Sequence, residues 1–299
     1  MNLTFKQLEA FLFSVKLRSF SAAADKLHTT QSAISKRMAE LEHAVGATLL
    51  HRSSKGLEMT QSGQRLLPLA EESQRLRGRI AAEMGTDSTL KGNFRLGATE
   101  LIAMTWLTAF IRKIQVQHPA LVIEPVIDAG LSLFHGLEAN KIDLVIIPGT
   151  YWGADFPTVK VGQVDDYWMA SPYIDLPDRP LQPAEFANYP ILEQSTGAAK
   201  NRYYESWLAE HGFRFNKVLA TNSTTVLRQL AVGGFGIAQM ALDYVRPDIE
   251  AGLLRIVRCD PMPPPMVYSA VYRKDDFSQA LEGIIAMAVE SCNFGLRPL

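Results

Sequence analysis

A group of polar and basic side chains between residues 30 and 55 has the composition of a surface that reads double-stranded DNA. A glutamine can pair bidentately with adenine in the major groove, and serine or threonine can donate to base edges or phosphates. Lysine and arginine neutralise phosphates, which makes binding weaken as salt rises. The alternative is a small helical domain whose polar face is only solvated. The candidate DNA contacts are Thr30, Gln31, Ser32, Ser35, Lys36, Arg37, Arg52 and Lys55.

Three helices and a short hairpin must position these side chains. The apolar spacing predicts helices over 5–16, 21–27 and 31–45, and short strands over 49–52 and 57–60. Thr4 and Ser21 are the expected N-caps of the first two helices, and Gly46 ends the third. This order is typical of a winged helix-turn-helix, in which the N-terminal end of the recognition helix enters the major groove.

A second set of polar residues lies at four strand-to-helix turns in the C-terminal two thirds of the chain. Helix N-termini carry free amide donors, so four such turns facing one cleft would suit an anion such as a carboxylate. Ordinary helix capping is the alternative at each turn. Glu100 could instead meet a ligand ammonium, or complement its own helix and face solvent. The candidate ligand-binding residues are Thr99, Glu100, Gly130, Ser132, Ser195, Thr196, Asn222 and Ser223.

The elements around these turns predict two α/β lobes. Strands at 94–97, 121–127 and 142–147 alternate with helices at 101–116 and 131–139, a βαβαβ pattern typical of an open parallel sheet. We expect the chain to cross between lobes twice, with lobe I at about 93–161 and 267–299 and lobe II at about 162–266. Ligands bind at the carboxyl ends of strands in such sheets.

Residues 61–92 connect the two parts of the chain. Leu66, Leu69, Leu76 and Ile80 fall near one stripe of a predicted helix over 61–84, and 85–92 has the composition of a hinge. Because a lone helix of about 20 residues is marginal in water, its stripe needs a partner. The same helix of a second subunit is the expected partner, and packing on its own domain is the alternative. We therefore expect domains at 1–60, 61–92 and 93–299.

The composition narrows the function classes. The 299 residues carry a net charge of −1, but residues 1–60 have eight basic and five acidic residues, or +3, and the remainder carries −4. A polyanion partner is therefore expected at the N-terminal part. Two cysteines do not make a disulfide framework, and we expect no metal or cofactor. With no secretory leader and no long apolar run, we expect a cytoplasmic protein without membrane contact.

The stretch from Phe5 to Ala70 resembles the DNA-binding end of LysR-type transcriptional regulators. The resemblance implies a winged helix-turn-helix, a long linker helix and a two-lobed effector domain like periplasmic solute-binding proteins. It also implies operator DNA, a homodimer or homotetramer, and control by a small-molecule effector; RNA polymerase is left open as a partner. The four anion-binding turns make a small organic acid or a related metabolite the expected effector. The matching positions are Ala22, Ala23, Ala24, Leu27, Thr30 to Lys36, Leu41, Glu42, Gly46, Leu49, Leu50, Arg52, Thr60 and Gly63.

One position departs from the family pattern. Family members often carry a hydroxyl residue where this chain has Gly130, so the resemblance does not supply a hydroxyl contact to the ligand at this position.

Two other function classes are compatible with parts of the sequence. A constitutive DNA-binding regulator without a physiological ligand is the alternative function. An enzyme is not expected, because no nucleophile–base set, phosphate-binding loop or metal-ligand cluster stands out.

Overall fold

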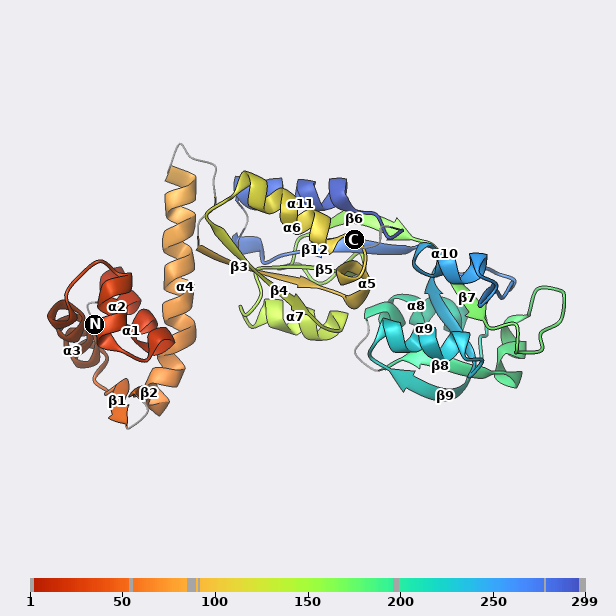
Figure 1. Cartoon of the computed structure of the whole chain (residues 1–299), viewed down its shortest axis with the longest axis horizontal. Coiled ribbons are helices and arrows are strands. Elements are labelled where there is room, and N and C mark those ends of the chain that lie inside the picture. Colours follow the sequence, from red (N-terminus) through yellow and green to blue (C-terminus); the bar gives the residue numbers. More distant parts are fainter. Residues whose placement is uncertain are drawn as a thin grey trace. The chain divides into compact units, whose positions relative to one another are not determined.

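The computed structural model describes residues 3–53, 56–84, 90, 92–195, 199–276 and 278–295. It divides into two units, Met1–Ser88 and Thr89–Leu299. Figure 1 labels the helices and strands of both units along the chain. Each unit is described by itself below.

The N-terminal unit is a winged helix-turn-helix followed by a long helix, as the sequence predicts. Thr4 and Gln7 form a reciprocal capping box at the start of the first helix, and Thr30 caps the third. Its elements are α1 (Phe5–Leu17), α2 (Phe20–Lys26), α3 (Gln31–Val45), β1 (Leu50–Ser53), β2 (Gly56–Met59) and α4 (Gln61–Met84).

The start of α2 corrects the predicted N-cap. Ser19, not Ser21, is the capping residue, and its hydroxyl accepts a hydrogen bond from the Ala22 amide at 3.3 Å. Arg18 adopts a left-handed conformation with φ of 51°, which ends α1. Because the chain reverses within two residues, α2 begins at Phe20 and includes Ser21 in its first turn.

The long helix α4 packs on α1 along only part of its apolar stripe. Leu66 and Ala70 belong to the core that Phe11, Ile34 and Leu41 form with their neighbours. The other three stripe residues remain exposed, by 58% for Leu69, 46% for Leu76 and 48% for Ile80. The predicted single stripe is therefore divided between two faces of the helix.

The second unit contains two five-stranded sheets, and the first is mixed rather than purely parallel. Its strand order is β4-β3-β5-β12-β6, in which β12 runs antiparallel to both of its neighbours. The strands are β3 (Gly92–Ala98), β4 (Leu121–Ile127), β5 (Leu144–Pro148), β6 (Thr158–Val164) and β12 (Met266–Val271). The accompanying helices are α5 (Glu100–Ala103), α6 (Leu107–Gln117), α7 (Gly130–Glu138) and α11 (Gln279–Ser291).

The second sheet has the order β11-β7-β10-β8-β9 and lies entirely within residues 166–256. The chain enters it directly after β6 and leaves it before β12, so two crossings join the sheets, as expected. Its strands are β7 (Asp166–Ala170), β8 (Pro190–Gln194), β9 (Asn216–Thr221), β10 (Ile237–Ala241) and β11 (Arg255–Ile256). The helices are α8 (Ala199–Glu210), α9 (Thr224–Val232) and α10 (Leu242–Glu250), with short 3₁₀ segments at Pro183–Asn188 and Lys274–Asp276.

The helix predicted over 101–116 is two helices, α5 and α6. The Thr105 hydroxyl donates to the Leu101 carbonyl at 2.7 Å, and the chain turns before Trp106. Trp106 is completely buried, with its ring centroid 5.9 Å from that of Phe110 and 6.1 Å from that of Phe294. The break thus places a large aromatic side chain in the core.

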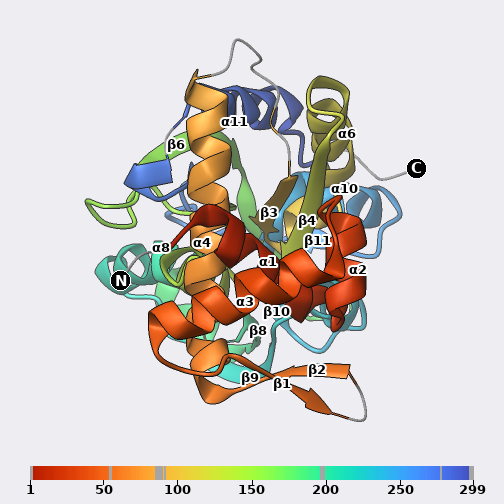
Figure 2. The ribbon, with the colours of Figure 1, turned by 90° about the vertical axis from the view of Figure 1, so that its left-hand side faces the viewer.

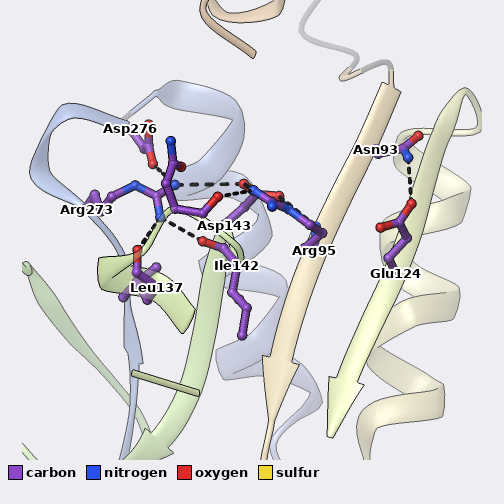
Figure 3. Close-up of polar contacts among 9 residues, drawn as sticks. Asn93, Arg95, Glu124, Leu137, Ile142, Asp143, Arg273 and Asp276 are labelled. Carbon is purple, nitrogen blue, oxygen red and sulfur yellow. Dashed lines mark hydrogen bonds and ion pairs between the residues drawn. The ribbon is translucent and has the colours of Figure 1, made fainter. Parts of the chain in front are cut away.

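A half-buried ion network joins β3 to the residue that precedes β5 and to the segment that follows β12. Arg95 on β3 donates to both carboxylate oxygens of Asp143, at 2.7 and 3.2 Å, and Arg273 approaches the same carboxylate at 3.8 Å. Figure 3 shows the three side chains pointing toward one another. Arg273 also donates to the carbonyls of Leu137 and Ile142, at 2.6 and 2.7 Å.

Arg273→Ala is expected to destabilise the chain by about 2–3 kcal/mol, because two carbonyls lose a charged donor and the Asp143 and Asp276 carboxylates lose an ion-pair partner. For a unit of this size that corresponds to a decrease in Tm of roughly 5–10 °C in a thermal melt. Arg258→Ala is the matched control, since its ion pair with Asp178 is exposed at both ends. Equal melting temperatures for the two variants would contradict the assignment.

Candidate functional site

The N-terminal end of α3 presents the side chains predicted to contact DNA. Thr30, Gln31, Ser32 and Lys36 are exposed, and Ser35 and Arg37 are half-buried. Figure 2 shows α3 with the β1–β2 hairpin of the same unit. The Thr30 hydroxyl accepts from the Ala33 amide at 3.3 Å and lies 3.0 Å from the Ser32 hydroxyl, so it also caps the helix. Within the described residues, neither Lys36 nor Arg37 forms an ion pair with a carboxylate.

The hairpin is anchored to α3 by Glu42. Its carboxylate accepts hydrogen bonds from the amides of Leu49 and Leu50, at 2.7 and 3.3 Å. Gly63 lies where a Cβ atom would stand 2.3 Å from the Leu49 carbonyl oxygen, so only glycine fits against this segment. These contacts explain why the sequence needs a glutamate and a glycine here. The predicted contacts Lys55 and the Arg52 side chain lie outside the described residues.

A cavity of about 370 Å³ lies within the second unit at the carboxyl ends of the strands. Six of the eight candidate ligand-binding residues line it: Thr99, Glu100, Gly130, Ser195, Asn222 and Ser223. Ser132 does not line it: this residue is exposed in the first turn of α7, so its assignment to the cavity is corrected. Thr196 lies outside the described residues.

Thr99 does not cap the helix that follows it. It occupies the N-cap position of α5, but its side chain makes no capping hydrogen bond. The helix has only four residues and ends at Ala103. Thr99 therefore contributes to the cavity wall without the dual role that the sequence predicts.

Glu100 crosses from α5 to the start of α9. Its carboxylate accepts from the hydroxyls of Ser223 and Thr225, at 3.0 and 2.9 Å, and from the Thr225 amide at 3.4 Å. The Thr224 amide donates to the other carboxylate oxygen. The alternative in which Glu100 faces solvent is therefore wrong: Glu100 lies in the first turn of α5, and its carboxylate binds at the N-terminus of α9.

Three residues at the cavity wall were missed by sequence reasoning. Asp166 is 2% exposed, and its carboxylate lies 2.7 Å from the Lys200 ammonium. Lys200 also donates to the Gln239 carbonyl at 2.5 Å. Burial raises the pKa of Asp166, and the adjacent Lys200 opposes that rise. In the described part of the chain, the Gln239 side-chain amide nitrogen has no hydrogen-bond partner.

Gly130 lies against the start of α8. A Cβ atom at Gly130 would stand 2.5 Å from the Cβ of Ala199, the first residue of α8. A hydroxyl side chain does not fit at this position in the present arrangement. The physical reason for the missing hydroxyl is therefore close packing between the two lobes.

Comparison with protein families decides what kind of protein this is. Residues 5–64 match the model of the bacterial regulatory helix-turn-helix protein, lysR family, and residues 87–293 match the LysR substrate binding domain. The chain belongs to the LysR family of transcriptional regulators. It is thus a DNA-binding regulator with a substrate-binding domain, and the family that the sequence predicts is confirmed.

Known relatives agree over nearly the whole length of this LysR-family chain. The HTH-type transcriptional regulator DgdR of Burkholderia cepacia is 28% identical over 270 residues, covering 90% of this chain and 86% of the relative. A Corynebacterium glutamicum OxyR mutant has the same fold, with a TM-score of 0.71 at 19% identity and coverage of 97% and 93%. CbnR complexed with its target DNA has a TM-score of 0.57 at 18% identity, covering 97% of this chain and all of that one.

DgdR and the relative HdfR of Yersinia pestis are named as transcriptional regulators rather than enzymes, which confirms the predicted function class. Across the described residues, no helix has the length and apolarity needed to cross a membrane. The same residues contain no group of three or more acidic, histidine or cysteine side chains placed to hold a metal ion.

Proposed function

We propose that this LysR-family regulator responds to a small metabolite that binds in the cavity of its second unit. The observation that carries the proposal is the cavity itself, which is lined by polar groups from elements of both sheets, of which Asp166 and Gln239 are buried. Pockets with a few converging polar groups at this place in α/β folds typically bind ligands. Thr99, Ser195, Asn222 and Gln239 are the contacts we propose.

The response to the metabolite is allosteric. Glu100 on α5 and the start of α9 belong to elements associated with different sheets, so their hydrogen bonds join the two lobes across the cavity. A ligand that favours one lobe arrangement shifts the population toward it. We propose that this shift changes the spacing of the α3 helices on operator DNA, where half-sites are read about one helical turn apart or multiples of it.

DNA reading needs a second subunit, which we propose is another copy of this chain in a homodimer or homotetramer. The exposed Leu69, Leu76 and Ile80 on α4 form the surface that we assign to this contact. Pairing would double the small positive charge of the DNA-binding part. The proposed DNA contacts are Thr30, Gln31, Ser32, Ser35, Lys36, Arg37, Arg52 and Lys55.

A metabolite panel tests the effector proposal. A true effector at a hundred times its Kd stabilises the protein by about 2.7 kcal/mol in a thermal melt. Thr99→Val keeps the shape of the wall but removes a hydroxyl, so we expect about tenfold weaker binding. Ser132→Ala is the control, since this exposed side chain lies outside the cavity.

The panel also separates two functions. If no metabolite changes either the melting temperature or the DNA footprint, the chain is a constitutive regulator instead. Equal loss of affinity in Thr99→Val and Ser132→Ala would place the effector elsewhere on the protein.

A further inference from the structure

The start of α9 is built as a complete carboxylate-binding site. Two backbone amides, of Thr224 and Thr225, and two hydroxyls, of Ser223 and Thr225, converge on one carboxylate group. A carboxylate that accepts several such hydrogen bonds at a helix N-terminus is strongly stabilised. The carboxylate present there is Glu100, which is supplied by an element more than 120 residues earlier in the chain.

In the same cavity, the side-chain amide of Gln239 lacks a hydrogen-bond acceptor among the described residues. Gln239 lines the cavity and is 8% exposed, yet its side-chain amide nitrogen has no acceptor among the described residues. A buried donor without an acceptor costs free energy unless a ligand or water supplies one. The cavity therefore offers a free donor at Gln239, while the donors at α9 are already occupied.

The charges that line the cavity also disfavour a carboxylate ligand. The lining residues include three carboxylates, Glu100, Asp128 and Asp166, and one ammonium, Lys200. Lys200 is already paired with Asp166. A further carboxylate would enter a negative environment with no unpaired lining ammonium in the described residues, whereas a neutral or cationic group would not meet this repulsion.

We propose that Glu100 is an internal carboxylate that fills the anion subsite at α9, so that the cavity selects a neutral or amine-bearing effector with an acceptor for Gln239. This ligand class rests on the proposed function of the cavity. Glu100 is then a specificity-determining residue: it replaces the acidic group of an effector and excludes carboxylates from this end. This effector class replaces the small organic acid that the four helix N-termini alone predict.

Removing Glu100 should convert the subsite into a receptor for free carboxylate. Glu100→Ala deletes one methylene and the carboxylate, which together have the composition of acetate. With sodium acetate as the probe, at constant ionic strength, we expect saturable thermal stabilisation of the full-length Glu100→Ala variant. Its Kd for acetate should be at least tenfold lower than that of the unmodified chain, in which Glu100 competes. Acetamide, the neutral isostere, should give no comparable stabilisation.

A second set of variants locates the acetate. Adding Ser223→Ala and Thr225→Val to Glu100→Ala removes both hydroxyl donors and should weaken acetate binding at least fivefold. Unchanged binding in this triple variant, or equal acetate binding by Glu100→Ala and the unmodified chain, overturns the proposal. If Glu100→Ala does not fold alone, its refolding yield should be higher in acetate than in acetamide, and equal yields overturn the proposal.

The acetate experiment is independent of the effector. Acetate binding by Glu100→Ala, together with a panel in which no metabolite binds the unmodified chain, would support the subsite but contradict the proposed response to a metabolite. A carboxylate effector that binds the unmodified chain, with unchanged affinity in Ser223→Ala and Thr225→Val, would support the response but contradict the selection against carboxylates by Glu100.

Discussion

Lys200→Met is expected to lower the Tm of the full chain by about 10 °C. The substitution leaves the Asp166 carboxylate, which is 2% exposed, without its counter-ion. Removing one partner of a buried ion pair typically costs about 3–5 kcal/mol, and each kcal/mol shifts Tm by roughly 2–4 °C in a domain of this size. Methionine fills much of the same space, so the lost charge rather than a cavity accounts for the effect.

The pH dependence of this variant has a defined sign. Burial already raises the pKa of Asp166, and loss of Lys200 removes the influence that opposes the rise. A carboxyl with a higher pKa in the folded than in the unfolded state stabilises the fold as it becomes protonated. The destabilisation should therefore be smaller at pH 5 than at pH 8, whereas a packing defect would be independent of pH.

Two further variants control this result. Lys217→Met removes an ammonium of the same kind whose side chain is 60% exposed in its ion pair with Glu193, so its Tm should change little. Adding Asp166→Asn to Lys200→Met removes the stranded charge and should recover at least half of the lost Tm. A double variant as unstable as Lys200→Met would show that Lys200 acts by packing.

Gln31→Ala is expected to weaken operator binding by at least about a hundredfold while leaving the melting temperature unchanged. A bidentate glutamine–adenine contact contributes about 1–3 kcal/mol of discrimination, and a dimer would lose it at both half-sites. Gln31 is the first residue of α3 and is exposed, so its truncation removes no core contact. Electrophoretic mobility shifts or fluorescence anisotropy on operator DNA, at stated salt, measure the loss.

The matched control is Gln64→Ala, a glutamine that is exposed on α4 of the same unit. It should leave operator affinity within about twofold. Gln31→Ala should also lose the preference for operator over random DNA, because nonspecific affinity depends on phosphate contacts. Unchanged discrimination would show that the base contacts come from elsewhere.

The DNA-binding unit could be predicted closely because its elements are local. Helix spacing, caps and glycine positions locate α1, α3 and the hairpin to within a residue or two, and the exposed polar end of α3 follows from the same pattern. The error at Ser21 was local too: two serines lie near one helix start, and the left-handed Arg18 selects the earlier one.

The cavity could be predicted only in part because it depends on contacts distant in sequence. Strand ends identified Thr99, Gly130 and Asn222, since parallel strands bring their carboxyl ends to one edge. The partners of Glu100 and Asp166 could not be found in this way, because helices from later in the chain supply them. Ser132 was misplaced for a local reason: it follows Gly130 by two residues, which is about 200° around α7, so its side chain is exposed.

Because Gly130 lies so close to Ala199, the residue type allowed at one of these positions depends on the residue at the other. Because a Cβ at residue 130 would stand only 2.5 Å from that of Ala199, any larger residue at position 130 requires the start of α8 to move. Among relatives, a serine or threonine at the position of Gly130 should therefore occur with a displaced start of the helix that corresponds to α8. The combined size of these two residues would then set the width of the cavity. Relatives that bind different effectors would be expected to differ at both positions together.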